Sequence, residues 1–384
     1  MQLLVESLFN GVAIGAVLLI AALGLAIVFG LMGVINLAHG ELIMLGAYTT
    51  YVVQLIFRLP FLQPFYDAYV LVALVAAFVV SGVVGILLER TVIRRLYGSP
   101  LETLLATWGV SLILQQFVRS VPLASAAGLV LALLLAMLAP VLMPERLLQG
   151  PRGRLTRFAS WAGSALVGVL VAAALGSQIS SLSRANPRNV DVTAPAWMRG
   201  SLDIAGLTMP VPRLVIMAIT LLAVLGISWF LARSVWGMRI RAVTQNRSMS
   251  DCLGIPTDTV DVLTFGVGSG LAGVAGVAVS LLGSVGPNVG ASYIVGCFMV
   301  VVLGGVGNLL GTVIASLAIG VMTDLIGAGR LLELWPGMPS PLAGVVDFFA
   351  TTSMARVLVF ALIVVFLQFR PAGLFPQKGR LVEA

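Results

Sequence analysis

Three polar side chains of different chemistry stand close together between two long apolar runs near the amino terminus. They are the amide of Asn36, the imidazole of His39, which is the only histidine in the chain, and the carboxylate of Glu41. Such groups are costly beside hydrocarbon, so in a membrane protein they usually face the bundle interior or a water-filled path. Flanking glycines predict that a helix breaks here, and irregular backbone at membrane depth needs protein or a cavity to supply hydrogen bonds. The pattern predicts the wall of a transport path; the alternative is an interfacial hairpin with a solvated turn.

Metal and phosphate chemistry are poorly supported by the remaining residues. His39 has no second histidine and no nearby cysteine, so no metal site is expected. Lys378 is the only lysine and stands in Gln-Lys-Gly, whereas a P-loop needs Gly-Lys-Ser or Gly-Lys-Thr. The chain therefore cannot be its own P-loop ATPase. If ATP drives its function, another polypeptide hydrolyses it, and we expect no cofactor.

The composition places these groups in a membrane. The chain has 384 residues, of which 59% are hydrophobic and 10% charged, and its mean hydropathy is +1.08. These values predict an all-α polytopic membrane protein. The net charge of +7 is clustered between the apolar runs, so it indicates membrane orientation and not nucleic-acid binding.

The apolar runs predict about nine to eleven transmembrane helices in one transmembrane domain, residues 1–384. A helix needs roughly 20 residues to cross the hydrocarbon. The second and ninth runs are short, which suggests that the polar motif and the Gly304–Asn308 turn begin inside the membrane. The runs are 8–32, 41–57, 69–88, 101–118, 123–143, 159–176, 211–231, 259–283, 291–306, 308–326 and 353–369.

The basic residues predict the orientation of these helices. If the runs alternate in direction, 14 of the 22 basic residues fall on one side and 8 on the other. Since cytoplasmic loops carry the excess of Lys and Arg, the N-terminus is predicted outside and the C-terminus inside.

Three segments differ from the regular succession of membrane-spanning runs. Residues 122–185 contain two apolar runs around a basic loop and are predicted to be an inserted helical hairpin. Residues 177–210 are predicted to form a polar loop on the outer, periplasmic side, which can fold over the outer mouth or meet a soluble partner. Residues 233–258 predict a short amphipathic helix at the inner surface, closed by Gly254 and Pro256. It either lies on anionic lipid or inserts into a groove of a partner protein.

A run of small residues predicts close helix packing. Glycines recur at positions that let helix backbones approach each other in lipid, and we favour this packing role over ligand contact. These glycines are Gly266, Gly270, Gly273 and Gly276.

Several motifs taken together resemble the permeases of branched-chain amino acid ATP-binding cassette (ABC) importers. The segments Gly24–Tyr48, with Gly-Val-Ile-Asn-Leu-Ala-His-Gly-Glu-Leu, and Leu88–Gly109 resemble the group as a whole. The segments Ile240–Arg247 and Ser284–Gly290 look most like its urea-importing branch. The resemblance covers about 1–121 and 186–380.

This resemblance implies a type II importer permease subunit in the bacterial inner membrane. Such a subunit pairs with a sister permease, sits on two ABC ATPase subunits and receives substrate from a periplasmic binding protein. Residues 233–258 then match the family's coupling loop. The residues of this loop singled out for ATPase coupling are Arg239, Arg241, Gln245, Asn246, Arg247 and Gly254.

Urea, or a close small amide, is the substrate this resemblance favours. A neutral substrate of that kind needs donors and acceptors, which Asn36, His39, Thr107 and Asn288 would supply. Asn288 has an alternative role in a simple turn. A branched-chain amino acid substrate is the alternative within the same fold, because the binding protein does most of the recognition.

Two other functional classes are alternatives to an ABC importer subunit. A passive channel or secondary transporter often keeps carboxylates inside its spans, whereas here the acidic residues lie near predicted helix ends. An intramembrane protease needs a nucleophile with a positioned base, for which the chain shows no motif.

Overall fold

The computed structural model describes residues 2–142, 162–173, 189–204, 207–330, 333 and 340–375. Its helices are α1 (Gln2–Met32), α2 (His39–Phe57), α3 (Tyr69–Thr91), α4 (Pro100–Ser120), α5 (Leu123–Leu142), an unlabelled helix Ala162–Ala173, α9 (Val211–Arg233), α10 (Val235–Gln245), α11 (Arg247–Cys252), α12 (Thr257–Ser280), α13 (Val289–Gly304), α14 (Leu309–Gly327), α16 (Ser340–Phe349) and α17 (Thr352–Phe369). Short 3-10 helices are η1 (Gln63–Ala68), η2 (Ile93–Arg95) and η3 (Ala196–Met198).

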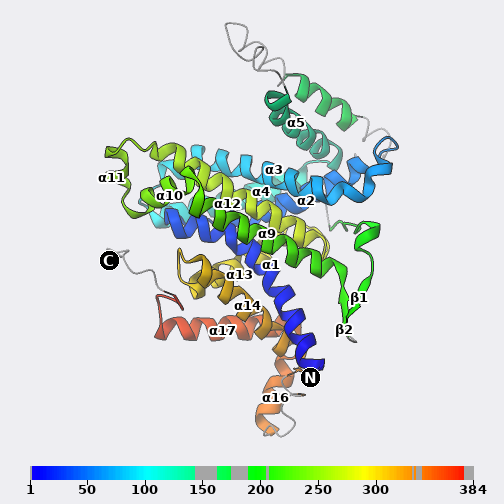
Figure 1. Ribbon diagram of the computed structural model, residues 1–384, viewed down its shortest axis with the longest axis vertical. Helices are drawn as coiled ribbons and strands as arrows, with labels where there is room; N and C mark the ends of the chain where they lie inside the picture. The colour runs from blue at the N-terminus through cyan, green and yellow to red at the C-terminus, as the bar shows by residue number, and fades with distance from the viewer. Residues whose placement is uncertain are drawn as a thin grey trace.

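The predicted helical membrane fold is confirmed. Within the described residues, seven helices are long and apolar enough to cross a membrane, and three shorter helices are also apolar. Figure 1 shows the helices running between two ends. We call the end with β1 (Ser201–Ile204) and β2 (Leu207–Pro210) the hairpin end, and the opposite one the α10–α11 end.

Helices α1, α2 and α12 form the centre of the bundle. They bury 78%, 83% and 78% of their most apolar stretches, whereas α4 and α9 bury only 22% each. The peripheral helices therefore turn most of their apolar side chains outward, as expected for surfaces that meet lipid or another membrane subunit.

The predicted break after the first helix is present. Helix α1 ends at Met32, Gly33 has a φ of +70°, and α2 begins at His39. The His39 Nε2 atom lies 3.0 Å from the carbonyl oxygen of Ala21, eleven residues before the end of α1. At 1.5 Å per residue, α2 begins about 16 Å back along α1. The polar motif therefore lies within the bundle, as the short second run suggested.

A second break lies close to the end of α1. Gly305 and Gly307, between α13 and α14, have φ values of +98° and +87°. A Cβ atom on Gly30 of α1 would lie 2.6 Å from the Cα of Gly307. The second break thus lies directly against the last turn of α1, and only glycine allows this approach.

The glycine run of α12 lies against two other helices, α2 and α3. Added Cβ atoms would meet Ile86 at Gly266, the Phe78 ring at Gly270, the Ala77 carbonyl at Gly273 and the Ile43 carbonyl at Gly276. Helix α12 therefore contacts α2 and α3 almost backbone to backbone.

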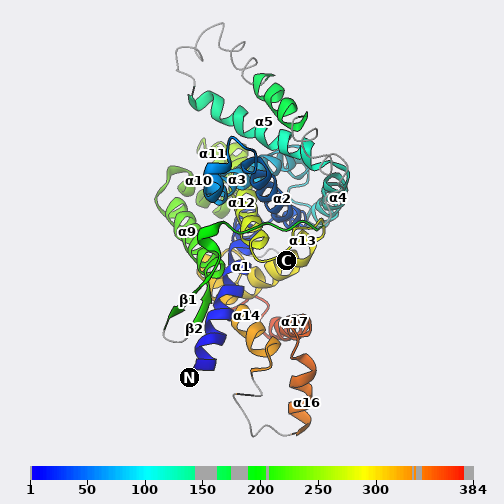
Figure 2. The same ribbon diagram turned by 90° about the vertical axis from the view of Figure 1, so that its right-hand side faces the viewer.

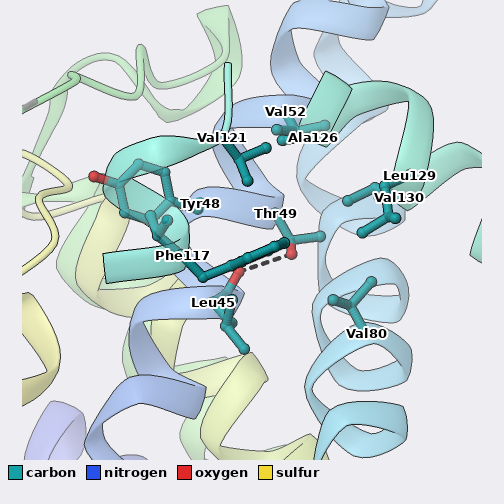
Figure 3. Close-up of a pocket in the computed structure, with 11 residues that line it drawn as sticks. Leu45, Tyr48, Thr49, Val52, Val80, Phe117, Val121, Ala126, Leu129 and Val130 are labelled. Atoms are coloured by element: carbon teal, nitrogen blue, oxygen red, sulfur yellow. Dashed lines mark hydrogen bonds between the residues drawn. The ribbon is translucent and has the colours of Figure 1, made fainter. Parts of the chain in front are cut away.

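Of the region 122–185, the structure describes 122–142 and 162–173, and α5 and the helix Ala162–Ala173 project from one side of the bundle, at the top of Figure 1. Helix α5 packs against Ala162–Ala173, since a Cβ on Gly128 would lie 2.3 Å from the Gly168 carbonyl oxygen. Where α5 meets α2, α3 and α4, Figure 3 shows an apolar cavity of about 80 Å³. The Thr49 hydroxyl is turned away to its own helix, 2.7 Å from the Leu45 carbonyl. The basic loop 144–157 lies outside the described residues.

The loop 177–210 departs from the purely helical expectation. Of this loop, the structure describes 189–204 and 207–210, and β1 and β2 pair there as an antiparallel hairpin. Its Thr193 carbonyl accepts hydrogen bonds from Gln54 (2.8 Å) and Tyr69 (2.7 Å). Val190 pairs with Val285. In Figure 2 this segment crosses in front of the helix ends, so it covers part of the hairpin end.

Candidate functional site

Helix α4 carries a polar residue at every fourth position, in a stripe that winds slowly around the helix. These residues, which we call the α4 polar stripe, are Thr103, Thr107, Ser111, Gln115 and Arg119. Residues four apart share one face of a helix. The first three are buried, although α4 as a whole is mostly exposed. The apolar side chains of the remaining surface are Leu101, Leu105, Trp108, Leu112, Ile113 and Phe117.

Side chains of the α4 polar stripe form hydrogen bonds with the broken segment, residues 33–38 between α1 and α2, and with the first turn of α2. Thr107 Oγ1 accepts a hydrogen bond from the Leu37 amide (3.2 Å). Glu41 Oε1 accepts two, from Ser111 Oγ (3.0 Å) and from Gln115 Nε2 (2.7 Å). The other carboxylate oxygen of Glu41 is buried and has no hydrogen-bond partner among the described residues. A buried carboxylate that is half satisfied is costly, which marks it as a candidate for binding a donor.

Asn36 and His39 are fully buried in the same place. Asn36 Oδ1 accepts from the Ala38 amide (3.0 Å), while Asn36 Nδ2 has no partner in the described part of the chain. His39 donates from Nε2 to the Ala21 carbonyl, which leaves Nδ1 as an acceptor, also without a partner there. The broken segment and the first turn of α2 therefore offer a donor, a neutral acceptor and a carboxylate oxygen within six residues.

The last residue of the α4 polar stripe, Arg119, reaches a surface depression. Arg119 Nη2 donates to Asn288 Oδ1 (2.7 Å), and Asn288 lines a depression of about 540 Å³ at the hairpin end. Helices α2 and α13 pack closely next to this depression, because a Cβ on Gly40 would lie 2.5 Å from the Gly290 carbonyl oxygen. Polar groups thus continue from the depression to the broken segment.

The structure brings together four of the five predicted path residues and reaches the fifth indirectly. Asn36, His39, Glu41 and Thr107 adjoin one another, and Asn288 connects through Arg119. Sequence reasoning missed Ser111, Gln115 and Arg119. Their fourfold spacing within an otherwise apolar helix was the available signal.

The segment 233–258 is two helices, so the expectation of one short amphipathic helix was wrong. Asn246 leaves the helical conformation and caps α11 by accepting from the Met249 amide (2.9 Å). As a result Ile240 is buried, whereas Met249 and Leu253 are 59% and 74% exposed. Gly254, with a φ of +78°, ends the pair.

The charged residues of this segment differ in their contacts. Arg239 lies over the Trp236 ring, 4.9 Å from its centroid, within the same helix. Arg241 lines a depression beside the break before α14, and Gln245 is exposed. Arg247 alone among the loop residues singled out reaches α12 through an ion pair, with its Nη2 2.6 Å from Asp261 Oδ2.

The ring of Tyr97 also contacts Arg247, the cation of this ion pair. The Arg247 guanidinium lies 4.9 Å from the centroid of the Tyr97 ring. Burial, and then the Asp261 and Glu89 carboxylates, raise the pKa of Tyr97 above its usual value, so the ring stays neutral beneath the cation. Arg94 next to it pairs with Asp258 at the start of α12. Helix α11 is therefore tied to α12 and to the segment that follows α3.

A bundle of apolar helices with broken segments and buried polar groups along an inner helix face is the architecture of a membrane transport subunit. Residues 7–121 and 103–367 match the family described as "Branched-chain amino acid transport system / permease component". The chain belongs to this family.

Full-length relatives support this assignment. The chain is 25% identical over 378 residues to the high-affinity branched-chain amino acid transport system permease protein LivH of Salmonella typhimurium, and equally to that of Escherichia coli K12. It is 25% identical over 370 residues to the permease protein BraD of Pseudomonas aeruginosa. Each alignment covers 96% of this chain and 94% of the relative. No solved structure matches the chain.

These comparisons confirm several predictions at a coarse level. The protein is a multi-pass permease subunit of the inner membrane, and its relatives are transport subunits, not enzymes. Membership of the family implies ATPase subunits and a substrate-binding protein as partners. The preference for the urea branch is not supported, since the named relatives carry branched-chain amino acid transport in their descriptions.

Proposed function

We propose that this protein is the permease subunit of an ABC importer for branched-chain amino acids. The observation that carries this proposal is the pairing of opposite charges along one path. Glu41 offers a free carboxylate oxygen, and the exposed Arg119 offers a guanidinium near the hairpin end. These two groups complement the ammonium and carboxylate groups of an α-amino acid. Urea is uncharged and gains nothing from such a pair.

The remaining predicted path residues take supporting roles in this proposal. Thr107 fixes the broken segment through Leu37, and Asn288 orients Arg119 at the depression. Asn36 Nδ2 and His39 Nδ1 supply polar contacts where α1 and α2 meet. The substrate would enter from the depression and pass along the α4 polar stripe.

In this proposal the hairpin end faces the periplasm and the α10–α11 end faces the cytoplasm. The excess of basic residues at the α10–α11 end supports this orientation. The exposed apolar side chains Val235, Met238, Met249 and Leu253 suit insertion of α10 and α11 into a groove of an ATPase subunit. A sister permease would complete a heterodimer in the membrane.

Uptake of labelled leucine by cells with and without this gene tests the substrate. We expect gene-dependent leucine uptake that excess isoleucine blocks and excess urea does not. It should stop when the partner ATPase is inactivated. Gene-dependent uptake of urea without uptake of leucine would refute the substrate, and leucine uptake that survives loss of ATPase activity would refute the ABC mechanism.

Replacing Arg247 by alanine is expected to lower ATP-driven uptake about fivefold, since couplings between sites are worth roughly 0.5–2 kcal/mol. The substitution removes the ion pair with Asp261 and the contact with Tyr97, so movement of α11 would no longer pull on α12. The measurement is uptake per ATP hydrolysed by the assembled transporter in proteoliposomes.

The matched control is Arg239→Ala, which removes a neighbouring cation whose ring contact stays within α10. It should keep more than half of the uptake per ATP. Equal losses in the two variants would contradict a specific link through Arg247. Recovery with Arg247→Lys would identify the charge as the essential feature.

A further inference from the structure

We propose that a cavity between α1, α13, α14 and α17 binds a membrane phospholipid, with its phosphate at Arg356 and an acyl chain inside. The cavity has a volume of about 210 Å³, includes no residue of the α4 polar stripe, and shares only Ser292 with the depression at Asn288. Its lining comes from the two ends of the described chain and from α13 and α14, which contribute Gly296 and Ile319.

The inner walls of this cavity are aliphatic and aromatic. Val17, Leu18, Ile319 and Phe360 line it, and Val17 and Ile319 are 4% and 2% exposed. Gly296 leaves room between them, since a Cβ there would meet Leu18 Cδ2 at 3.1 Å and Phe360 Cζ at 3.9 Å. The lining also includes the buried Thr323, whose hydroxyl donates to the Ile319 carbonyl (2.7 Å). Such walls suit a hydrocarbon chain better than a strongly polar solute.

The rim of the cavity is polar and exposed. It carries Ser292 and Arg356, with the half-buried Tyr293 between wall and rim. The cavity is therefore amphipathic, with an apolar interior beneath a cation and hydroxyl groups. A phosphate bound to Arg356 would gain charge-assisted hydrogen bonds.

Arg356 differs from the other arginines described at the hairpin end. Each of the others donates to a side chain or a carbonyl: Arg58 to Thr193, Arg119 to Asn288, Arg199 to Ala194, Arg213 to Asn10 and Arg330 to Ser7. For Arg356 the described residues provide no such acceptor and no ion pair. The carboxylate of Asp324, which follows the lining residue Thr323, lies within electrostatic reach of Arg330 and Arg213, and its Oδ2 atom has no hydrogen-bond partner among the described residues.

The charge of the residues that line the cavity favours a phospholipid over an amino acid as its ligand. No aspartate or glutamate lines the cavity in the part of the chain that the structure describes. The ammonium group of an amino acid would therefore be buried beside a cation without a partner. The phosphodiester of a phospholipid needs only the cation. Next to the cavity, α17 exposes Val357 and Leu362, which places this rim on an apolar outer surface.

Photocrosslinking of the assembled transporter tests the proposal. The probe is phosphatidylglycerol with a diazirine in its acyl chain, present at a small fraction in nanodiscs. We expect label on peptides from α13 and α17. Arg356→Gln should lower this label about tenfold, the size expected for one charge-assisted contact with phosphate, and Arg356→Lys should retain most of it. Gly296→Leu should remove it by filling the cavity.

The matched control is Arg330→Gln, which removes a cation at the same end whose partners are Glu6 and Ser7. It should label like the wild type. If Gly296→Leu does not assemble, Gly296→Ala tests the same space, since the Leu18 side chain can yield by a few tenths of an ångström. Its label should fall at least about twofold, because even one added methyl group is felt in a packed site.

Three results would overturn the proposal. Equal labelling of Arg356→Gln and Arg330→Gln would show that Arg356 holds no phosphate. Displacement of the probe by excess L-leucine would instead assign the cavity to an amino acid. Equal labelling by a diacylglycerol probe, which lacks the phosphate, would reduce the site to unspecific contact with hydrocarbon.

Discussion

Replacing Glu41 by glutamine is expected to lower leucine uptake at least about tenfold while the protein still reaches the membrane. A glutamine carbonyl can accept the hydrogen bonds from Ser111 and Gln115, so the contact between α2 and α4 is kept. The variant loses the negative charge on the free oxygen of a side chain that is 1% exposed. A hydrogen bond to a charged group contributes about 1.5–3 kcal/mol, and 1.4 kcal/mol is a factor of about ten.

Initial rates of labelled leucine uptake, divided by the amount of assembled transporter, measure this effect. Glu102→Gln is the matched control, because Glu102 lies in the exposed first turn of α4, away from Glu41. It should transport like the wild type. A normal rate for Glu41→Gln would remove Glu41 from the substrate path. Asn36→Ala and His39→Ala, tested singly, should also lower uptake, by smaller factors.

Replacing Gly273 by alanine is expected to lower the stability of the folded protein strongly. The added Cβ would lie 2.2 Å from the Ala77 carbonyl oxygen and 2.7 Å from Ser81 Oγ. Ser81 Oγ itself donates to the Leu42 carbonyl (3.0 Å), so the clash strikes where α2, α3 and α12 meet. Overpacking of this kind costs about 1–3 kcal/mol even where neighbours can move, and here the neighbour is backbone.

Thermal stability of the solubilised protein, followed by size-exclusion chromatography after heating, measures the loss. The matched control is Gly109→Ala on α4, where no atom lies within 4 Å of an added Cβ. Alanine favours a helix by about 1 kcal/mol over glycine, so this variant should be as stable as the wild type or slightly more so. Equal melting of the two variants would contradict the close contact at Gly273.

Much of the fold follows from local sequence. Lipid leaves backbone groups no partner outside their own helix, so apolar runs must form helices, whatever lies beside them. The same reasoning located the break before His39, because Gly33 and the polar residues after it cannot continue an apolar helix. The glycine spacing of α12 indicated close packing, although it could not name α2 and α3 as the partners.

Other features depended on residues far apart in the chain. The sequence spacing of the α4 polar stripe showed a continuous row of polar residues, but only the folded bundle sets Ser111 and Gln115 against Glu41, about 70 residues earlier. Likewise, Asn246 looked like part of one amphipathic helix until its capping of α11 divided the segment.

The sequence by itself determined a polytopic helical permease with a polar break near its first helix, since membrane insertion and helix breaking depend on neighbouring residues. Only the tertiary structure decided which helix faces meet, which of the described arginines lack an acceptor and where a cavity remains. Those outcomes depend on the packing of side chains from distant segments, which no local pattern specifies.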